Sequence, residues 1–402
     1  MRFNAFSSAS KTALRSLKRT TRRTFLFFFA LVTLYFRFYG ETPPLSRVSS
    51  TLGAMTSYYR HCSSCCEVIT EDLVLTKRLT STGKNIVCLT LDQQQTRLKI
   101  VARGRGRINR GYLYSAAMFL EHVRRSAVHK TRIFYVVNGQ VDVVWVIEDD
   151  ASLPQNLIDE LQSRKIIVLV HSVPLNFSSA GSIFVPNFHF IKHRGFRSLI
   201  AKLKQSELPF AQRDALVYWR GATTGVLQTN TIDRKSSIDD DCRKLTRVKA
   251  ATASRSVPWL DVAMTKPVQL CKSHAAMSSR VSKARYSPET EWIRHKGLLE
   301  MDGNVDAWGH VWRMASGSIV FLVQSDYKHY FSDRLVEGVH YIGVRRDLSD
   351  LIKRTRIVTQ TDNATVTYLS QIAANAKALM RELEYNEVVE RVAQSLLEKW
   401  IA

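Results

Sequence analysis

Several short motifs that identify common enzyme classes are missing from the sequence. There is no G-x-x-x-x-G-K-[ST] phosphate loop and no G-x-G-x-x-G fingerprint, which argues against the usual nucleotide hydrolases and dinucleotide-dependent enzymes. Neither a G-x-S-x-G nucleophile elbow nor an H-E-x-x-H zinc motif occurs, which argues against serine hydrolases of that type and zinc peptidases. Any catalytic site must therefore be sought in less regular patterns.

Acidic residues are scarce relative to basic ones. The chain has 35 Asp and Glu against 58 Lys and Arg, a formal net charge of +23. Such an excess indicates an anionic partner, which can be nucleic acid, an acidic membrane surface or a phosphate-bearing substrate. Nucleic-acid-binding proteins usually concentrate their positive charge, whereas here it is spread along the chain. We expect no nucleic acid among the partners, although the Arg-rich segment 97–110 keeps that alternative open.

The first 39 residues have the pattern of a targeting element. Residues 1–23 are rich in Arg and Lys without an acid, and residues 24–39 are dominated by Phe, Leu and Tyr. A basic flank before an apolar core predicts an uncleaved signal-anchor, with a cytoplasmic tail and the rest of the chain in the lumen of the endoplasmic reticulum or Golgi. The alternative is a mitochondrial presequence, but the continuous apolar block is not amphipathic.

Other features fit a type II protein with a lumenal portion. Residues 40–80 are predicted to form a stem between the anchor and the folded part. Asn176 and Asn363 lie in glycosylation sequons, which are used only in the secretory pathway. Six cysteines allow up to three disulfides there. The cluster from Cys62 to Cys66 resembles half a zinc site, but a second pair at suitable spacing is missing, so no metal ligand is predicted.

Short apolar runs alternate with helical spacers over the rest of the chain. The runs lie at 86–91, 141–148, 165–173 and 215–221, with helical patterns at 112–123 and 368–400. This alternation predicts β-α-β units with parallel sheets. A polar junction divides the series into two α/β domains, 81–212 and 213–402, that are expected to face a cleft. Residues 228–256 are polar and are predicted to form an exposed loop excursion.

The segment WRGATTG, residues 219–225, follows an apolar run and suits a phosphate group. Gly221 permits close backbone approach, Thr223 offers a hydroxyl, and Arg220 offers a bidentate fork. An ordinary strand-to-helix turn with a surface Arg is the alternative that the spacing leaves open.

Polar side chains also end two apolar runs of the first domain. Asp149 and Asp150 follow one run, and a carboxylate at the carboxyl end of a buried parallel strand points into the crevice of an α/β domain. Either can act as a general base that deprotonates an acceptor hydroxyl. His171 and Ser172 end the next run and are predicted to contact the acceptor from the same rim. A solvated turn and a structural histidine are the alternatives.

One acidic, Gly-containing loop lies between apolar runs in the stretch 295–350. Asp302, Gly303 and Asn304 follow the first run, and a helix-like segment with Trp308 comes next. In α/β units ligands bind at the loops that leave the strand ends, so this loop is a second candidate for ligand binding.

Six segments of the second half recur, in the same order, in a known family. They are VPNFHF (185–190), YWRGATTG (218–225), DGNVDAWG (302–309), ASGSIVF (315–321), YFSDRL (330–335) and VHYIGVRRDLSDL (339–351). On these segments the chain resembles glycosyltransferase family 90, which includes protein O-glucosyltransferases and fungal capsule xylosyltransferases. The resemblance implies a GT-B-like fold of two Rossmann-like domains with the donor nucleotide in the C-terminal one. It also implies inversion at the anomeric carbon, and therefore a carboxylate base, for which Asp150 fits best by position and Asp149 next.

The resemblance also implies a set of donor contacts. These are Arg220, Gly221, Thr223, Asp302, Gly303, Asn304, Trp308, Arg313 and Asp333. One position departs from the family pattern, because Gly309 stands where many members have an arginine. Arg313, one helical turn further on, is the expected substitute, since positions four apart share a helix face.

The sequence therefore predicts an inverting glycosyltransferase anchored in the membrane by residues 24–39. It would move glucose or xylose from a UDP-sugar to a hydroxyl of a protein or glycan acceptor. The UDP-sugar is a substrate, no tightly bound cofactor is expected, and a divalent metal is left open. The alternative, motivated by Gly309, is a catalytically inactive lumenal binding protein that retains the fold.

Overall fold

The structure is a computed structural model that describes part of the chain. The described ranges are 73–92, 96–102, 110–126, 140–146, 152–178, 182–225, 238–271 and 284–401. The predicted tail, the signal-anchor, most of the stem and the candidate bases Asp149 and Asp150 lie outside these ranges. Within them, no helix combines the length and the apolar character that a bilayer span requires.

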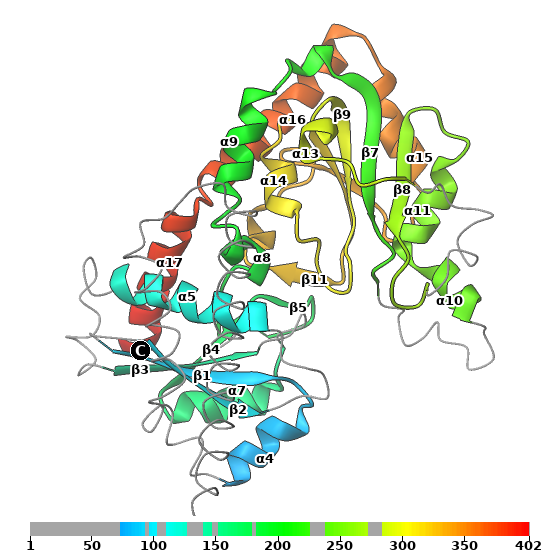
Figure 1. The fold of residues 1–402 in the computed structure, drawn as a ribbon. Coiled ribbons are helices and arrows are strands. Elements are labelled where there is room, and N and C mark those ends of the chain that lie inside the picture. The colour runs from blue at the N-terminus through cyan, green and yellow to red at the C-terminus, as the bar shows by residue number, and fades with distance from the viewer. Residues whose placement is uncertain are drawn as a thin grey trace, which may run out of the picture. The chain divides into compact units, whose positions relative to one another are not determined.

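A first five-stranded sheet is built from residues 86–184, in the order β2-β1-β3-β4-β6 (Figure 1). The strands are β1 (Ile86–Asp92), β2 (Thr96–Ala102), β3 (Gln140–Val146), β4 (Ile166–Val170) and β6 (Ser182–Phe184). β3, β4 and β6 are parallel to one another, as predicted for a β-α-β series. β1 is antiparallel to both β2 and β3, so the expectation of a wholly parallel sheet is wrong. The short β1–β2 connection allows only a hairpin, because a parallel crossover needs a dozen or more residues.

Burial on both faces explains the apolar strands of this sheet. All five residues of β4 are buried, and a strand covered on both sides has no solvated face that polar residues could occupy. The helix α5 (Arg110–Ser126) contributes Phe119 and Val123 to the core, and Phe119 meets the ring of Trp145 edge to face at 6.2 Å. The helix α7 (Gln155–Ser163) buries Leu157, Ile158 and Leu161.

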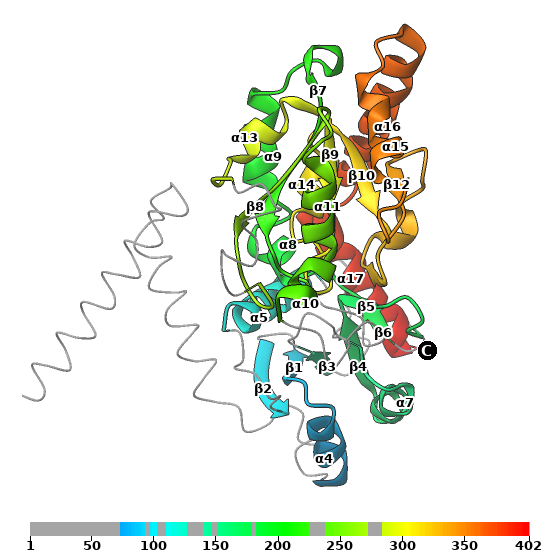
Figure 2. The same ribbon diagram turned by 90° about the vertical axis from the view of Figure 1, so that its right-hand side faces the viewer.

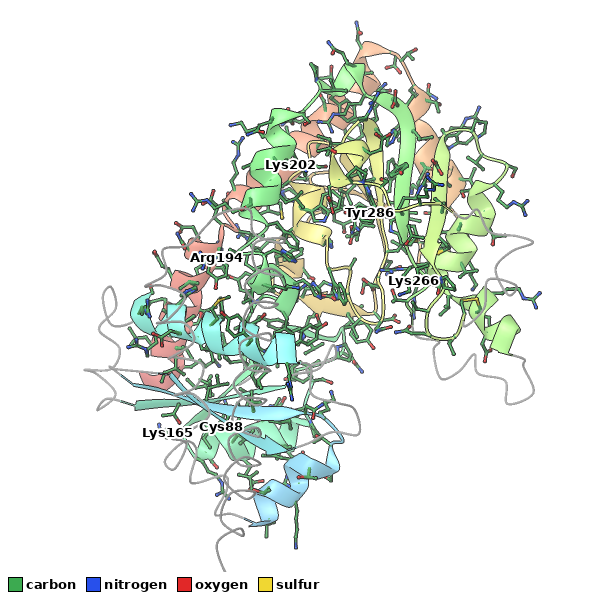
Figure 3. All side chains as sticks on the ribbon, viewed as in Figure 1. Cys88, Lys165, Arg194, Lys202, Lys266 and Tyr286 are labelled. Atoms are coloured by element: carbon green, nitrogen blue, oxygen red, sulfur yellow. A yellow bond between two sulfur atoms is a disulfide. The ribbon has the colours of Figure 1, made fainter. Side chains whose placement is uncertain are left out.

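A second five-stranded sheet, in the order β12-β10-β9-β7-β8, is parallel throughout. Its strands are β7 (Asp214–Ala222), β8 (Leu260–Lys266), β9 (His295–Glu300), β10 (Ile319–Val323) and β12 (Ile342–Val344). The helices α10 (Ile238–Lys244) and α11 (Thr246–Ser254) precede β8, and α14 (His310–Met314), α15 (Leu351–Thr355) and α16 (Asn363–Arg381) follow later in the chain. Because the strands are parallel, their carboxyl ends meet at one edge. Lys266, the last residue of β8, marks this edge (Figure 3).

The helices α10 and α11 correct one expectation from the sequence. Residues 228–256 were predicted to be an exposed loop, but α11 buries Val248, Ala250 and Ala251 beside β8 (Figure 2). Their small apolar side chains form a helical stripe that the surrounding polar residues obscure.

Two elements link the segments that carry the two sheets. The strand β5 (Ser172–Pro174), which follows β4, pairs antiparallel with β11 (Tyr327–His329), which follows β10. The last helix, α17 (Tyr385–Ile401), contacts α5, β4 and β6, so the end of the predicted second domain packs on elements of the first.

Candidate functional site

Polar side chains gather at the carboxyl edge of the second sheet. They come from the segments after four strands: Thr223 and Thr224 after β7, Gln269 after β8, Asp302, Asn304 and Asp306 after β9, and Ser325 after β10. The parallel strands bring these distant segments together, because all of their carboxyl ends lie at one edge. This is the edge at which ligands bind in α/β domains.

Arg247 lies at the centre of this edge, although the sequence analysis did not single it out. From α11 its Nε donates to the Asp302 carbonyl oxygen at 2.8 Å, and Nη2 donates to the Met301 carbonyl oxygen at 3.1 Å. Nη1 donates to the Ala222 carbonyl oxygen at 3.2 Å and to the Thr224 hydroxyl at 2.5 Å. Burial lowers the pKa of Arg247 to about 10, so the guanidinium is still charged at neutral pH.

The hydrogen-bond partners of Arg247 are all uncharged. Three are backbone carbonyl oxygens and one is a hydroxyl, and in the described ranges the guanidinium forms no ion pair. The carboxylates of Glu300, Asp302 and Asp306 lie near enough to favour the charged form of this half-buried guanidinium, but none of them forms an ion pair with it in the described ranges, so an anion from outside the chain can still pair with it. A Cβ added at Gly303 would lie 3.3 Å from Nη2 of Arg247 and 3.1 Å from the Thr224 hydroxyl, so a larger residue at position 303 would crowd both groups.

Arg220, the arginine that the sequence favoured, has a different environment. Its Nη1 and Nη2 donate to the two carboxylate oxygens of Asp261 at 2.8 and 2.6 Å, and its guanidinium lies 4.1 Å from the ring of Tyr218. Asp261 is the second residue of β8, so the Arg220 side chain leans toward the amino end of the sheet. The structure does not bring Arg220 together with Thr223, and its donor contact stays a prediction.

Gly221 is needed for packing in this strand. A Cβ at that position would lie 2.5 Å from the ring of Trp219. The side chain of Thr223 faces inward, where its hydroxyl donates to the Val268 carbonyl oxygen and accepts from the Val268 amide. These two residues therefore shape the turn after β7.

The loop after β8 is tied to its neighbours by Gln269. Its side-chain oxygen accepts from the Gly225 amide at 3.1 Å, and its nitrogen donates to Asn304 at 2.9 Å. Gln269 holds a left-handed backbone with φ of 55°, a strained conformation that tends to occur at functional sites. The disulfide between Cys242 and Cys271 joins this loop to α10. It is one of the disulfides that the cysteine content allowed.

Acidic groups at the end of β9 are buried and partly neutralised. Burial raises the pKa of Asp302 to about 7, although the Ser325 hydroxyl donates to its carboxylate. Glu300 is also buried, and its carboxylate accepts from Nη1 of Arg313 at 2.5 Å. An anion at this edge thus meets less negative charge than the count of carboxylates suggests.

Arg313 fills the space beside Gly309. A Cβ at Gly309 would lie 3.1 Å from Cζ of Arg313 and 2.4 Å from Nε1 of Trp312. The guanidinium also lies 5.0 Å from the ring of Trp292. Because its Nη1 is bound to Glu300, Arg313 is held in place and does not extend freely toward a ligand.

The loop 302–309 contacts the short helix α8 (Phe188–Lys192). The Asn187 amide donates to the Asp306 carboxylate at 2.6 Å, and the ring of His189 stacks on Trp308 at 3.5 Å. Burial lowers the pKa of His189 to about 4, so this stacked imidazole is neutral at physiological pH. The part of the loop from Asp306 to Trp308 is therefore held against α8.

Comparison with known proteins decides the family. The model of glycosyl transferase family 90 matches residues 183–400, more than half of the chain. The chain belongs to glycosyltransferase family 90. The resemblance inferred from the six segments is thereby confirmed.

The relatives match only in part. Protein O-glucosyltransferase 3 of Rattus norvegicus is 23% identical over 122 residues, which is 30% of this chain and 24% of the relative. The uncharacterized protein 179R of Invertebrate iridescent virus 6 is 25% identical over 173 residues, 38% of this chain and 14% of the relative. The chain thus spans less than a quarter of the length of each.

The similarity to solved structures is distant. HepE of Anabaena, solved with UDP-glucose, matches with 12% identity and a TM-score of 0.33 over 61% of this chain and 68% of that one. At that TM-score the likeness assigns neither a fold nor a ligand.

The remaining candidates of this family 90 chain come from other segments. His171 and Ser172 are buried after β4, and the Ser172 hydroxyl lies 3.2 Å from Nδ1 of His329 on β11. Asp333 is exposed in the turn η4 (Ser332–Arg334). Both sequon asparagines, Asn176 and Asn363, are exposed. Among the residues that the structure describes, no group of three His, Cys, Asp or Glu is arranged to hold a metal ion.

Proposed function

We propose that this chain is an inverting glycosyltransferase that takes a sugar from UDP-sugar and transfers it to an acceptor hydroxyl. The observation that carries the proposal is Arg247, a half-buried cation whose described hydrogen-bond partners are all uncharged. It lies at the edge where α/β domains bind nucleotides. In the proposal the diphosphate of the donor pairs with this guanidinium, and a GT-B-like arrangement with the donor at the second sheet is part of it.

The contacts of Arg247 also explain how the chain would accelerate sugar transfer. Negative charge builds up on the departing diphosphate in the transition state, so a guanidinium held in advance lowers the barrier. Arg247 is held in this way by the carbonyl oxygens of Met301, Asp302 and Ala222. The Thr224 hydroxyl, which accepts from Arg247, lies beside Gly303.

The acceptor side rests on the sequence. A carboxylate must take the proton of the attacking hydroxyl when the sugar is inverted, and Asp150, with Asp149 as the neighbour, is the proposed base. His171 and Ser172 follow the strand β4 and are proposed to border the acceptor. Some of the relatives are named protein O-glucosyltransferases, which supports glucose as the sugar and a protein as the acceptor, with xylose and a glycan as the alternatives.

The setting is proposed from the sequence as well. Residues 24–39 would anchor the chain in the endoplasmic reticulum or Golgi membrane with residues 40–402 in the lumen. The disulfide between Cys242 and Cys271 supports an oxidising compartment.

Two measurements on the full chain test the function. The first is binding of UDP by calorimetry. The second is turnover of UDP-glucose and UDP-xylose, either by hydrolysis or by transfer to a peptide acceptor. Asp150→Asn should lower turnover by roughly 10²–10⁴-fold, because a general base contributes that much, while UDP affinity stays unchanged.

The outcomes separate the two candidate functions. Wild-type turnover in Asp150→Asn means that the base is a different residue. No UDP binding at millimolar concentration favours the inactive binding protein, the candidate motivated by Gly309.

A further inference from the structure

A basic surface covers the helix α8 and the helix that follows it, α9 (Arg197–Gln205). The sequence has no acidic residue between Glu160 and Glu207. Two of the cations, Arg194 and Lys202, are labelled in Figure 3, where both lie on the left-hand side. The exposed Lys and Arg side chains on or between the two helices, here called the basic face, are Lys192, Arg194, Arg197, Lys202 and Lys204.

The charge of the basic face is not compensated by neighbouring acids. None of its five cations forms an ion pair with an Asp or Glu of the part of the chain that the structure describes. Glu207, which follows α9, pairs with Lys377 at 2.6 Å instead. Burial lowers the pKa of His193 and Glu289 of the helix α13 (Glu289–Trp292) opposes this, but Glu289 also accepts from the Tyr286 hydroxyl. A surface of one uncompensated sign attracts a partner of the opposite charge.

The turn between α8 and α9 is held rigidly by the core beneath it. Arg194, Gly195 and Phe196 have φ values of 46°, 68° and 59°, three left-handed residues in a row. Such a backbone persists only where its surroundings fix it. Phe196 is buried, and a Cβ at Gly195 would lie 3.3 Å from both the Phe190 ring and the Tyr385 amide nitrogen. The two helices therefore present their cations in one preformed arrangement, which lowers the entropy cost of binding.

The basic face borders the loop 302–309 of the proposed donor site. His189 of α8 stacks on Trp308 at 3.5 Å, and Asn187, the N-cap of α8, donates to Asp306. The side chain of Trp308 is 50% exposed. Exposed Trp together with Arg is the composition that contributes most to binding in protein interfaces. A partner on the basic face would thus lie next to the loop that carries Asp302 and Gly303.

The apolar residues of α9 argue against a lipid surface as the partner. Leu203 is buried, and Leu199 and Ile200 are partly buried against the core. A helix that binds in a membrane interface needs a broad exposed apolar face in addition to its basic one. The helix α9 has used its apolar side chains inside the protein, so its exposed side suits an anionic polymer that stays in water.

We propose that the basic face binds an acidic segment of a polypeptide acceptor and holds this acceptor beside the loop 302–309. The proposal rests on the proposed function, because it takes sugar transfer to occur at the carboxyl edge of the second sheet. It adds the chemical class of the acceptor, a polypeptide with Asp and Glu residues near the hydroxyl that receives the sugar. Opposite charges across such an interface raise the association rate and disfavour neutral and basic polypeptides.

Three labelled peptides test the preference for acidic polypeptides. They contain one Ser and are identical apart from a block of six Glu, six Gln or six Lys residues, and their binding to the full chain is measured by fluorescence anisotropy. We expect the Glu peptide to bind at least about tenfold more tightly than the Gln peptide at low salt. The difference should shrink as NaCl is raised, because salt screens exposed charges. Equal Kd values for the Glu and Gln peptides overturn the proposal.

Paired charge reversals locate the binding surface. Lys202→Glu combined with Lys204→Glu reverses two cations of the basic face, so the Kd of the Glu peptide should rise by roughly tenfold. Lys249→Glu combined with Lys353→Glu is the matched control, since both residues are exposed and the net charge changes equally. These two lysines lie on α11 and α15, across the view from α9 in Figure 1. The control should keep the wild-type Kd within about twofold.

The outcomes separate this inference from the proposed function. If the full chain binds no UDP, the proposed function fails, and the acidic peptide is then no acceptor. If UDP binds but the Lys202 and Lys204 variant matches the control, only the docking surface is wrong. The same variants are titrated with a single-stranded oligonucleotide and with phosphatidylserine vesicles. If the reversal weakens one of these and leaves the Glu peptide unaffected, the basic face binds nucleic acid or membrane, and the proposal is overturned.

Discussion

The contrast between Arg247 and Arg220 gives the sharpest test of the donor site. Arg247→Met removes a half-buried guanidinium at the carboxyl edge, whereas Arg220→Met removes one that is paired with Asp261. Both substitutions remove one positive charge and replace it with an unbranched side chain. Only the first should weaken the binding of the diphosphate.

The magnitude follows from the hydrogen bonds of Arg247. A guanidinium has five N–H donors. Four are used within the chain: Nε once, Nη1 twice and Nη2 once. One N–H of Nη2 is left, and this nitrogen lies 3.3 Å from the position that a Cβ at Gly303 would take. One charge-assisted hydrogen bond contributes about 1.5–3 kcal/mol, so the Kd of UDP should rise by roughly 10–150-fold.

Calorimetry with the full chain measures this change. UDP and uridine are titrated into the wild type, Arg247→Met, Arg247→Lys and Arg220→Met. The loss should appear with UDP and be small with uridine, because uridine carries no phosphate. Arg247→Lys keeps the charge but not the fork and should lie between the wild type and Arg247→Met.

Stability has to be followed in the same variants. Arg247→Met leaves three carbonyl oxygens and the Thr224 hydroxyl without this donor, so a lower Tm is expected. A UDP affinity of Arg247→Met within twofold of the wild type, in a folded variant, refutes the reasoning. If Arg220→Met alone loses affinity, the expectation from the sequence is right and the geometric argument is wrong.

Two further predictions concern charge and cross-linking near the site. Burial raises the pKa of Asp302 to about 7, so its carboxylate ionises between pH 6 and 8 beside the proposed diphosphate, and the affinity for UDP-glucose should fall over that range. Asp302→Asn should remove most of this fall. If the wild type binds UDP-glucose equally well at pH 6 and at pH 8, the diphosphate does not lie beside Asp302. Cys242→Ser removes the disulfide to Cys271, which spans 29 residues, and should lower the free energy of unfolding by about 3–4 kcal/mol in denaturant titrations. An unchanged denaturation midpoint would mean that other contacts hold the loop after β8 in place.

Much of the second half could be predicted from the sequence because its signals are local. The strand β10 is a short apolar run and β7 contains one, since a parallel strand buried on both faces has few polar positions. The loop from Asp302 to Asn304 follows β9 directly, so its place at the carboxyl edge could be inferred from strand order alone. The six segments identified the family for the same reason.

The first half was less predictable because strand direction depends on partners. The residues of β1 have the same apolar pattern as those of β4, yet β1 is antiparallel to β3 and β4 is parallel to it. No local feature of an apolar run distinguishes these two cases. The choice is made by the connections and by the neighbouring strand.

The sequence alone determined that this protein has alternating α/β elements, a glycine-containing acidic loop after a buried strand, and the segments of glycosyltransferase family 90. Only the tertiary structure decided which arginine lies at the carboxyl edge of the second sheet. Arg220 lies in the segment that the sequence favoured but turns to Asp261, 41 residues away, while Arg247 reaches carbonyl oxygens up to 55 residues away. A side chain takes its direction from partners that are close only after folding, and spacing along the chain does not record them.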